Sequence, residues 1–278
     1  MRIAWLLAFC SAVSFAQDAR EIVSRSVVQT QNNSDSARNY TYVERTEIRD
    51  LDGSGNGDAL RSRTFDVTIL DGTPYRRLVA RNDKPLPPPE DKKEEQKFAE
   101  SMAQRRSETP EERARRLAER QRKRAEMRVP LQDIPKAFDL RIAGEENVNG
   151  EQTWVIDALP RAGYRPTTGF TRFFPKVKGR FWISKRDYAW VKVDAEALDT
   201  ISYGLFLARV QRGSRLHFEQ ARVYGDVWMP TRLEAAAAVR LALFKYMHTG
   251  YQVTYKDYRK FEVESHLMGF HELPQPQP

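Results

Sequence analysis

Apolar and polar residues alternate over much of the chain, and this two-residue period is typical of antiparallel strands that bury one face. Phe65, Val67 and Ile69 share one face in this way, and the hairpin-forming pair Asp71-Gly72 follows them. Between residues 139 and 264 the alternation recurs in segments that short turns separate. We therefore predict about ten antiparallel strands in one large curved sheet, closed or half closed, with little room for parallel connections.

One segment of this region has two interpretations. Residues 234–244 contain four consecutive alanines that begin at Ala235, and local propensity favours a helix there. The position of the segment between strands with tight turns favours a strand instead. We interpret it as a strand and keep the helix as the alternative.

The N-terminus has the features of a secretory signal peptide. Arg2 supplies a positive start, residues 3–15 form a short apolar run, and the small residues Ser14 and Ala16 precede a cleavage point. Cleavage after Ala16 would also remove Cys10, the single cysteine. We therefore expect residues 1–16 to be a leader and the mature protein to be exported to the periplasm or the outer cell envelope.

A charged insertion interrupts the strands at residues 83–130. Residues 88–128 carry 13 basic and 10 acidic side chains, and we expect two exposed helices there, at about 90–106 and 110–128. Thr109 with Glu112 forms a capping-box pattern at the start of the second helix. The basic residues form either a solvated helix face that glutamates balance or a contact with an anionic membrane surface or another envelope protein. The contact candidates are Arg113, Arg116, Arg120, Lys123 and Arg124.

Overall charge and cysteine content narrow the classes of partner. Lys and Arg number 46 against 38 Asp and Glu, and the net charge of +8 would suit a nucleic-acid ligand. Export would separate the protein from cytoplasmic nucleic acid, so we predict no nucleic-acid partner. A single cysteine excludes a disulfide framework, a structural zinc finger and an iron–sulfur cluster.

The sequence offers no convincing active site. His217, His248, His266 and His271 lack the spacing of metal ligands, and no Gly-x-Ser-x-Gly motif is present. Asp157 and Asp194 lie within strands and are at most a weak acid–base pair, because a salt bridge or a solvent-facing position is the simpler interpretation of each. We predict no enzyme activity, no metal and no cofactor.

Several strands carry apolar or aromatic residues on both faces, and both faces must then be covered. One face would pack against helices and the other would line a cavity, or the two would form an ordinary two-layer core. The candidates for lining a ligand cavity share period-two positions in the strands. They are Phe65, Val67, Ile69, Trp154, Ile156, Phe181, Ile183, Trp190, Tyr251, Val253 and Tyr255.

The C-terminal half resembles the outer-membrane lipoprotein-sorting superfamily, the LolA/LolB-like periplasmic carriers. The resemblance rests on Gly179-Arg-Phe-Trp-Ile-Ser-Lys-Arg-Asp-Tyr188, on Trp228-Met-Pro230 and on Tyr255-Lys-Asp-Tyr-Arg-Lys-Phe261. It implies an unclosed β-barrel whose concave, apolar side is covered by helices and holds acyl chains. The carriers' Lys/Arg-Arg-Pro segment has no counterpart on a strand here, so no functional residue is transferred.

Together these observations give a division of the chain and two hypotheses of function. The N-terminal helix and meander would occupy residues 17–82, the remainder of the half-barrel residues 131–264, and a tail residues 265–278. The first hypothesis is a non-catalytic envelope protein that binds a lipid or a lipoprotein acyl chain in an apolar cavity. The alternative is a scaffold that binds another envelope protein through its sheet edge and its charged helical arm.

Overall fold

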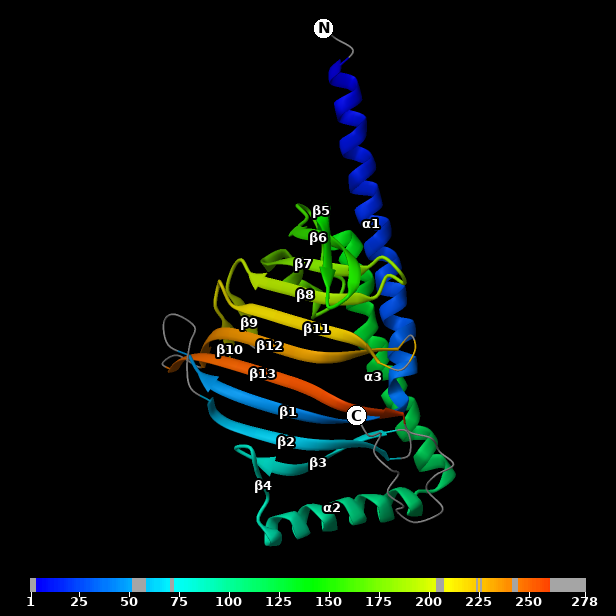
Figure 1. The fold of residues 1–278 in the computed structure, drawn as a ribbon, viewed down its shortest axis with the longest axis vertical. Coiled ribbons are helices and arrows are strands. Elements are labelled where there is room, and N and C mark those ends of the chain that lie inside the picture. The colour runs from blue at the N-terminus through cyan, green and yellow to red at the C-terminus, as the bar shows by residue number, and fades with distance from the viewer. Residues whose placement is uncertain are drawn as a thin grey trace.

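The computed structural model describes residues 4–51, 59–70, 73–203, 208–223, 225, 227–241 and 245–260. It confirms an α+β fold with one large antiparallel sheet, which is curved and not closed into a barrel (Figure 1). Within the described residues the sheet has 13 strands where about ten were expected, because it includes three very short ones, β4, β9 and β10. The strands are β1 Tyr40–Asp50, β2 Ala59–Leu70, β3 Thr73–Arg81, β4 Lys84–Pro85, β5 Phe138–Val148, β6 Glu151–Pro160, β7 Val177–Ser184, β8 Trp190–Ala197, β9 Ile201–Tyr203, β10 Ala208–Val210, β11 Arg215–Val223, β12 Val227–Leu241 and β13 Lys245–Lys260.

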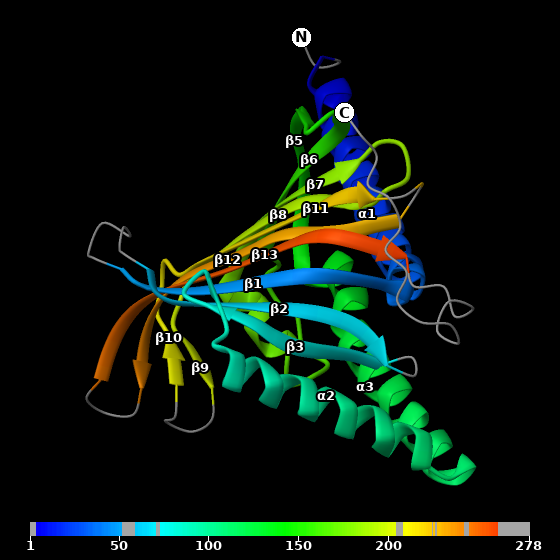
Figure 2. The same ribbon diagram turned by 60° about the horizontal axis from the view of Figure 1, so that its bottom comes forward.

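The order of the strands places the first strand beside the last one. Across the sheet it is β4-β3-β2-β1-β13-β12-β11-β8-β7-β6-β5, so β1 lies beside β13 in the interior. β10 pairs with the far end of β12 and β9 pairs with β10. These short strands and the far ends of β12 and β13 bend away from the rest of the sheet (Figure 2). The two edges are therefore different: β5 has 11 residues, whereas β4 has two.

The alanine-rich segment is a strand up to Leu241, as interpreted, and residues 242–244 lie outside the described residues. Ala235 pairs with Leu216 of β11 and with Tyr251 of β13, so the segment has a partner strand on each side. This long-range pairing outweighs the local helix propensity of alanine.

Helix α1 Ala4–Ser36 continues through the short helix η1 Ala37–Asn39 into the first strand. α1 and α3 Pro110–Ala137 run along one face of the sheet, and α2 Pro88–Ser107 lies at the β3–β4 edge (Figure 1). The short helix η2 Thr171–Lys176 precedes β7. Within the residues that the structure describes, none of the helices has the length and apolar character needed to cross a membrane. The predicted leader 1–16 stays a prediction, and the predicted tail 265–278 lies outside the described residues.

The charged segment forms the two expected helices, and the capping box is present. The Thr109 hydroxyl accepts from the Glu112 amide at 3.2 Å, and the Glu112 carboxylate accepts from the Thr109 amide at 2.9 Å. α2 has no buried residue, but α3 continues past the expected end of the insertion, with Pro130 and Pro135 inside it. Prolines cost hydrogen bonds within a helix. Here the last turns of α3 are held by their burial in the main core.

Apolar clusters lie on both faces of the sheet, as the strand pattern predicted. The larger one joins α1 and the end of α3 to β5, β6 and β7. The smaller one includes Val155, Trp182 and Trp228, which is 1% exposed. Asn33 of α1 exchanges two hydrogen bonds of 2.7 Å with the backbone of Trp228. The C-terminal part of α1 is thereby tied to the start of β12.

Candidate functional site

The sheet has two faces of different character. We call the side against α1 and α3 the helix face and the other side the open face. Side chains alternate along a strand, and cross-strand partners share a face. Ile156 and Phe181 are such partners, and so are Trp154 and Ile183. By this criterion the eleven predicted cavity residues all fall on the helix face, and their role in ligand binding stays a prediction.

One part of the helix face is packed solid against the helices. Ile156 and Ile183 are fully buried, and Phe181 is buried beside them. They contact Ala19 and Val23 of α1, and Trp154 and Trp190 flank the same cluster. The Trp190 indole donates to the hydroxyl of Ser26 in α1 at 2.8 Å. These five predicted residues therefore form the interface between sheet and helices in this structure.

A second part of the helix face is hollow. A cavity of about 280 Å3 lies over β1, β2, β3 and β13. Phe65 and Tyr251 are the two predicted residues that line it, and Tyr251 is 39% exposed. The guanidinium of Arg76 lies 4.1 Å from the centre of the Phe65 ring and bonds to the carboxylate of Glu44. We call this cavity the arginine pocket; its lining residues are Thr46, Ile48, Arg61, Arg63, Phe65, Arg76 and Tyr251.

A cluster of tyrosines lies beside the pocket on the same face. The ring of Tyr42 lies 5.9 Å from that of Tyr255 and 5.4 Å from that of Tyr258. Burial and the nearby Glu44 carboxylate raise the pKa of Tyr255 to about 12, so its phenol stays neutral. The remaining predicted residues Val67, Ile69 and Val253 are buried in the surrounding packing.

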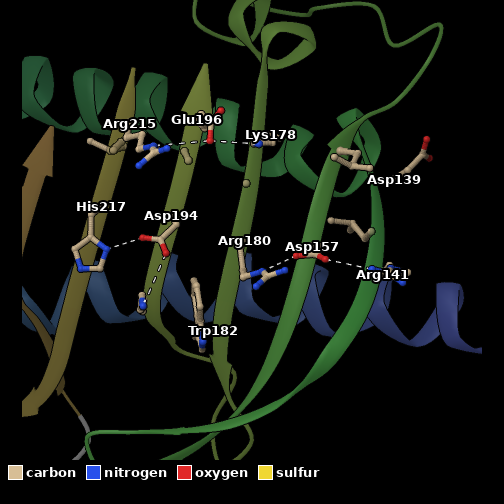
Figure 3. A pocket seen from close by; sticks show the side chains of 16 residues that line it. Asp139, Arg141, Asp157, Lys178, Arg180, Trp182, Asp194, Glu196, Arg215 and His217 are labelled. Atoms are coloured by element: carbon tan, nitrogen blue, oxygen red, sulfur yellow. Dashed lines mark hydrogen bonds and ion pairs between the residues drawn. The ribbon is translucent and has the colours of Figure 1, made fainter. Parts of the chain in front are cut away.

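The open face carries rows of alternating charges that cross several strands (Figure 3). The carboxylate of Asp157 lies 2.6 Å from Arg180 and 3.4 Å from Arg141. The carboxylate of Asp194 lies 2.5 Å from Nδ1 of His217. A groove of about 900 Å3 runs over these rows, and its cations have acidic neighbours.

This geometry argues against Asp157 and Asp194 as an acid–base pair. The hydrogen bond from Arg180 lowers the pKa of Asp157, although burial opposes the shift. Arg180 is the cross-strand neighbour of both aspartates and lies between them. Each carboxylate therefore acts as an ion-pair partner, which is the simpler of the two interpretations that the sequence allowed.

The predicted contact residues of the charged insertion differ in exposure and in their charged neighbours. Arg116 is only 16% exposed and lies 2.8 Å from Glu108. Lys123 is exposed but paired with Glu119 at 2.7 Å. Burial and the neighbouring Arg124 lower the pKa of Arg120. The five residues therefore do not form one exposed basic surface, and their role in membrane or partner contact stays a prediction.

Sequence reasoning missed the arginines of the pocket. Arg61 and Arg63 precede Phe65 at the same two-residue spacing, so they occupy the same face of β2. This alternation was the available signal.

No protein-family model matches the chain, and no curated protein is significantly similar to it. Solved structures do match. An outer membrane lipoprotein-sorting protein domain from Vibrio parahaemolyticus has a TM-score of 0.36 and 11% identity, over 90% of this chain and 96% of that chain. A DUF1329 family protein from Desulfovibrio piger has a TM-score of 0.33 and 9% identity, over 88% and 93%. A LolA superfamily protein from Nitrosomonas europaea has a TM-score of 0.28 and 10% identity, over 88% and 93%. Two of these structures are described as a lipoprotein-sorting protein domain and a LolA superfamily protein, the group of proteins that the sequence resembles.

Proposed function

We propose that the protein is an exported binding protein of the cell envelope that holds a lipid or lipoprotein acyl chain against its helix face. The observation that supports this best is an unbroken apolar row across seven neighbouring strands, from β5 to β13. Each member is the cross-strand partner of the next. The row consists of Ile142, Ile156, Phe181, Val193, Phe218, Leu233 and Val253.

The helices cover only part of this face. The cluster that contains α1 and the end of α3 draws its strand residues from β5 to β8. Leu216 and Tyr251, further along the same face, are 42% and 39% exposed. Apolar surface that stays in contact with water favours an apolar ligand, and each buried methylene contributes about 0.8 kcal/mol.

The arginine pocket alone is too small for a long acyl chain, so this proposal requires that α1 shift and free more of the helix face. The arginine pocket, at about 280 Å3, is below the usual range of about 300–1,000 Å3 for ligand pockets. A long acyl chain therefore needs more of the face than is open. α1 is held by its apolar contacts, by the Ser26–Trp190 bond and by a 3.0 Å bond from Arg25 to Tyr188. Acyl methylenes would replace the apolar contacts when α1 shifts.

Binding of a fluorescent fatty acid to the purified protein tests this proposal. Tyr251→Glu places a charge on the part of the helix face that the helices leave exposed. We therefore expect the variant to bind the fluorescent fatty acid about tenfold more weakly. Leu159→Glu is the matched control, because Leu159 is 56% exposed and lines the groove on the open face. Failure of the wild type to bind the probe, with no lipid in native mass spectra, would exclude the proposal.

The sheet edge favours a second candidate, the docking of another envelope protein. β5 leaves one side of an 11-residue strand without a partner strand among the described residues, and such an edge can accept an added strand. Capture of a protein partner that Ala143→Pro abolishes, with fatty-acid binding intact, would support this function. Charge reversal at Lys123 and Arg124 would show whether the charged insertion takes part in binding the protein partner.

A further inference from the structure

The arginine pocket has an unbalanced charge, unlike the open face. Arg61 and Arg63 of β2 and Arg76 of β3 line it together. Arg76 has the carboxylate of Glu44 as a partner. Among the residues that the structure describes, neither Arg61 nor Arg63 forms an ion pair, whereas Arg141 and Arg180 on the open face share Asp157.

The strand register explains why these two cations lack a partner. Arg61 lies opposite Ile48 of β1 and Arg63 lies opposite Thr46, neither of which is acidic. The intervening Glu47 points to the open face, where Arg45 and Arg49 bind it. On its other side Arg63 lies opposite another cation, Arg81, and like charges in directly opposed positions destabilise a sheet.

Arg81 has its own carboxylate partner, because its guanidinium lies 3.0 Å from Glu90 of α2, outside the residues that line the pocket. Glu90 thus balances the charge of Arg81, and the charges of Arg61 and Arg63 stay unbalanced. An anion bound between the arginines would balance them. Guanidinium groups suit phosphate in particular, because their planar arrangement of donors matches two phosphate oxygens at once.

Thr46 and three apolar or aromatic side chains line the rest of the pocket. The Phe65 ring lies beneath Arg76, and Ile48 and Tyr251 complete that side. Arginine donors beside an aromatic floor would contact both parts of an amphipathic molecule, the anionic group and the start of its apolar chain. The volume of about 280 Å3 suits a headgroup better than a whole lipid.

We propose that the arginine pocket binds the phosphate group of the ligand, through Arg61, Arg63 and Arg76, and so fixes the polar end of a phosphate-bearing amphiphile. This inference rests on the proposed acyl-chain function and names the headgroup that the carried molecule would bear. The same phosphate chemistry could come from a soluble phosphate compound, and the experiment separates the two sources.

Isothermal titration calorimetry of the full protein tests the inference with three ligands: decanoyl lysophosphatidic acid, the uncharged monodecanoylglycerol and inorganic phosphate. The test variant is Arg61→Gln with Arg63→Gln. The control is Arg141→Gln with Arg215→Gln, which removes the same charge from side chains that are 77% and 76% exposed near the open-face groove. Thermal unfolding of each variant confirms that it is folded.

We expect the test variant to bind the lysophosphatidic acid at least about thirtyfold more weakly, since thirtyfold is the effect of losing one charge-assisted hydrogen bond and the variant lacks two arginines. The control variant should bind it as the wild type does, and binding of monodecanoylglycerol should be the same in all three proteins. Equal binding of lysophosphatidic acid to wild type and test variant would overturn the inference and leave the acyl-chain proposal intact. Binding of inorganic phosphate that needs both arginines, with neither lipid bound, would support the phosphate site and overturn the acyl-chain proposal.

Discussion

Replacing Trp190 by phenylalanine should loosen α1 from the sheet. The Trp190 indole donates to Ser26, whose side chain is fully buried in α1. Phenylalanine keeps an aromatic ring near Phe181, whose centre is 5.4 Å away, but has no donor. Losing such a bond and leaving a buried acceptor unpaired costs about 1–3 kcal/mol. The Ser26 hydroxyl still donates to the carbonyl of Val23, so we expect the lower half of that range, about 1–2 kcal/mol.

This loss should appear as easier opening of α1. A change of about 1.4 kcal/mol is tenfold in an equilibrium constant, so a state with α1 displaced should become about tenfold more populated. Hydrogen exchange in residues 18–36 should accelerate by that factor, and a fluorescent fatty acid should bind faster in stopped-flow measurements.

Trp182→Phe provides a matched control for the Trp190 substitution. Trp182 is 5% exposed and its indole donates to Glu146 at 2.6 Å, but it belongs to the cluster on the other face. This variant should lose similar stability without faster exchange in α1 or faster uptake. Equal acceleration in both variants, or none in Trp190→Phe, would refute the idea that α1 controls access to the helix face.

Three further predictions concern stability. Ile183→Ala should lower the free energy of unfolding by about 3 kcal/mol, whereas Leu159→Ala, at an exposed leucine, should change it by less than about 0.5 kcal/mol, both read from urea titrations. Thr109→Ala should cost about 1 kcal/mol and speed hydrogen exchange in the first turn of α3. Because Arg180 lowers the pKa of Asp157, ionised Asp157 stabilises the fold above about pH 4, and this contribution is lost as the pH falls through the lowered pKa. Asp157→Asn should therefore be less stable at pH 7 and should lose less stability than the wild type on acidification.

Local sequence patterns predicted the helices and strands of this fold. Long-range contacts decided where each helix or strand ends and which other elements pack against it. The capping box of Thr109 and Glu112 could be recognised because it involves neighbouring residues. The continuation of α3 through Pro130 could not, because it depends on burial of Ile134 against α1. Long-range contacts also decide the alanine segment of β12, because pairing with a strand on each side outweighs its local helix propensity.

The candidate site was predictable to the same extent. Period-two alternation predicted which side chains of one strand share a side, and the register between strands then puts all eleven candidates on the helix face. It could not show that Ile156 is packed beneath α1 while Tyr251 lies open, since that depends on the path of the helices. The charge of Arg61 and Arg63 became informative only when the register showed neutral residues and another cation opposite them.

The pairing of β1 with β13 makes assembly of the sheet depend on the end of the chain. Glu44 and Tyr255 are partners although about 210 residues separate them, and such distant pairings form slowly. Until β13 is available, the meander of β1, β2 and β3 has a free edge at β1 and is not joined to β12. A chain interrupted before residue 245 would keep that edge exposed, and free strand edges promote aggregation. Completion of synthesis, and of any transport across a membrane, would thus come before completion of the fold.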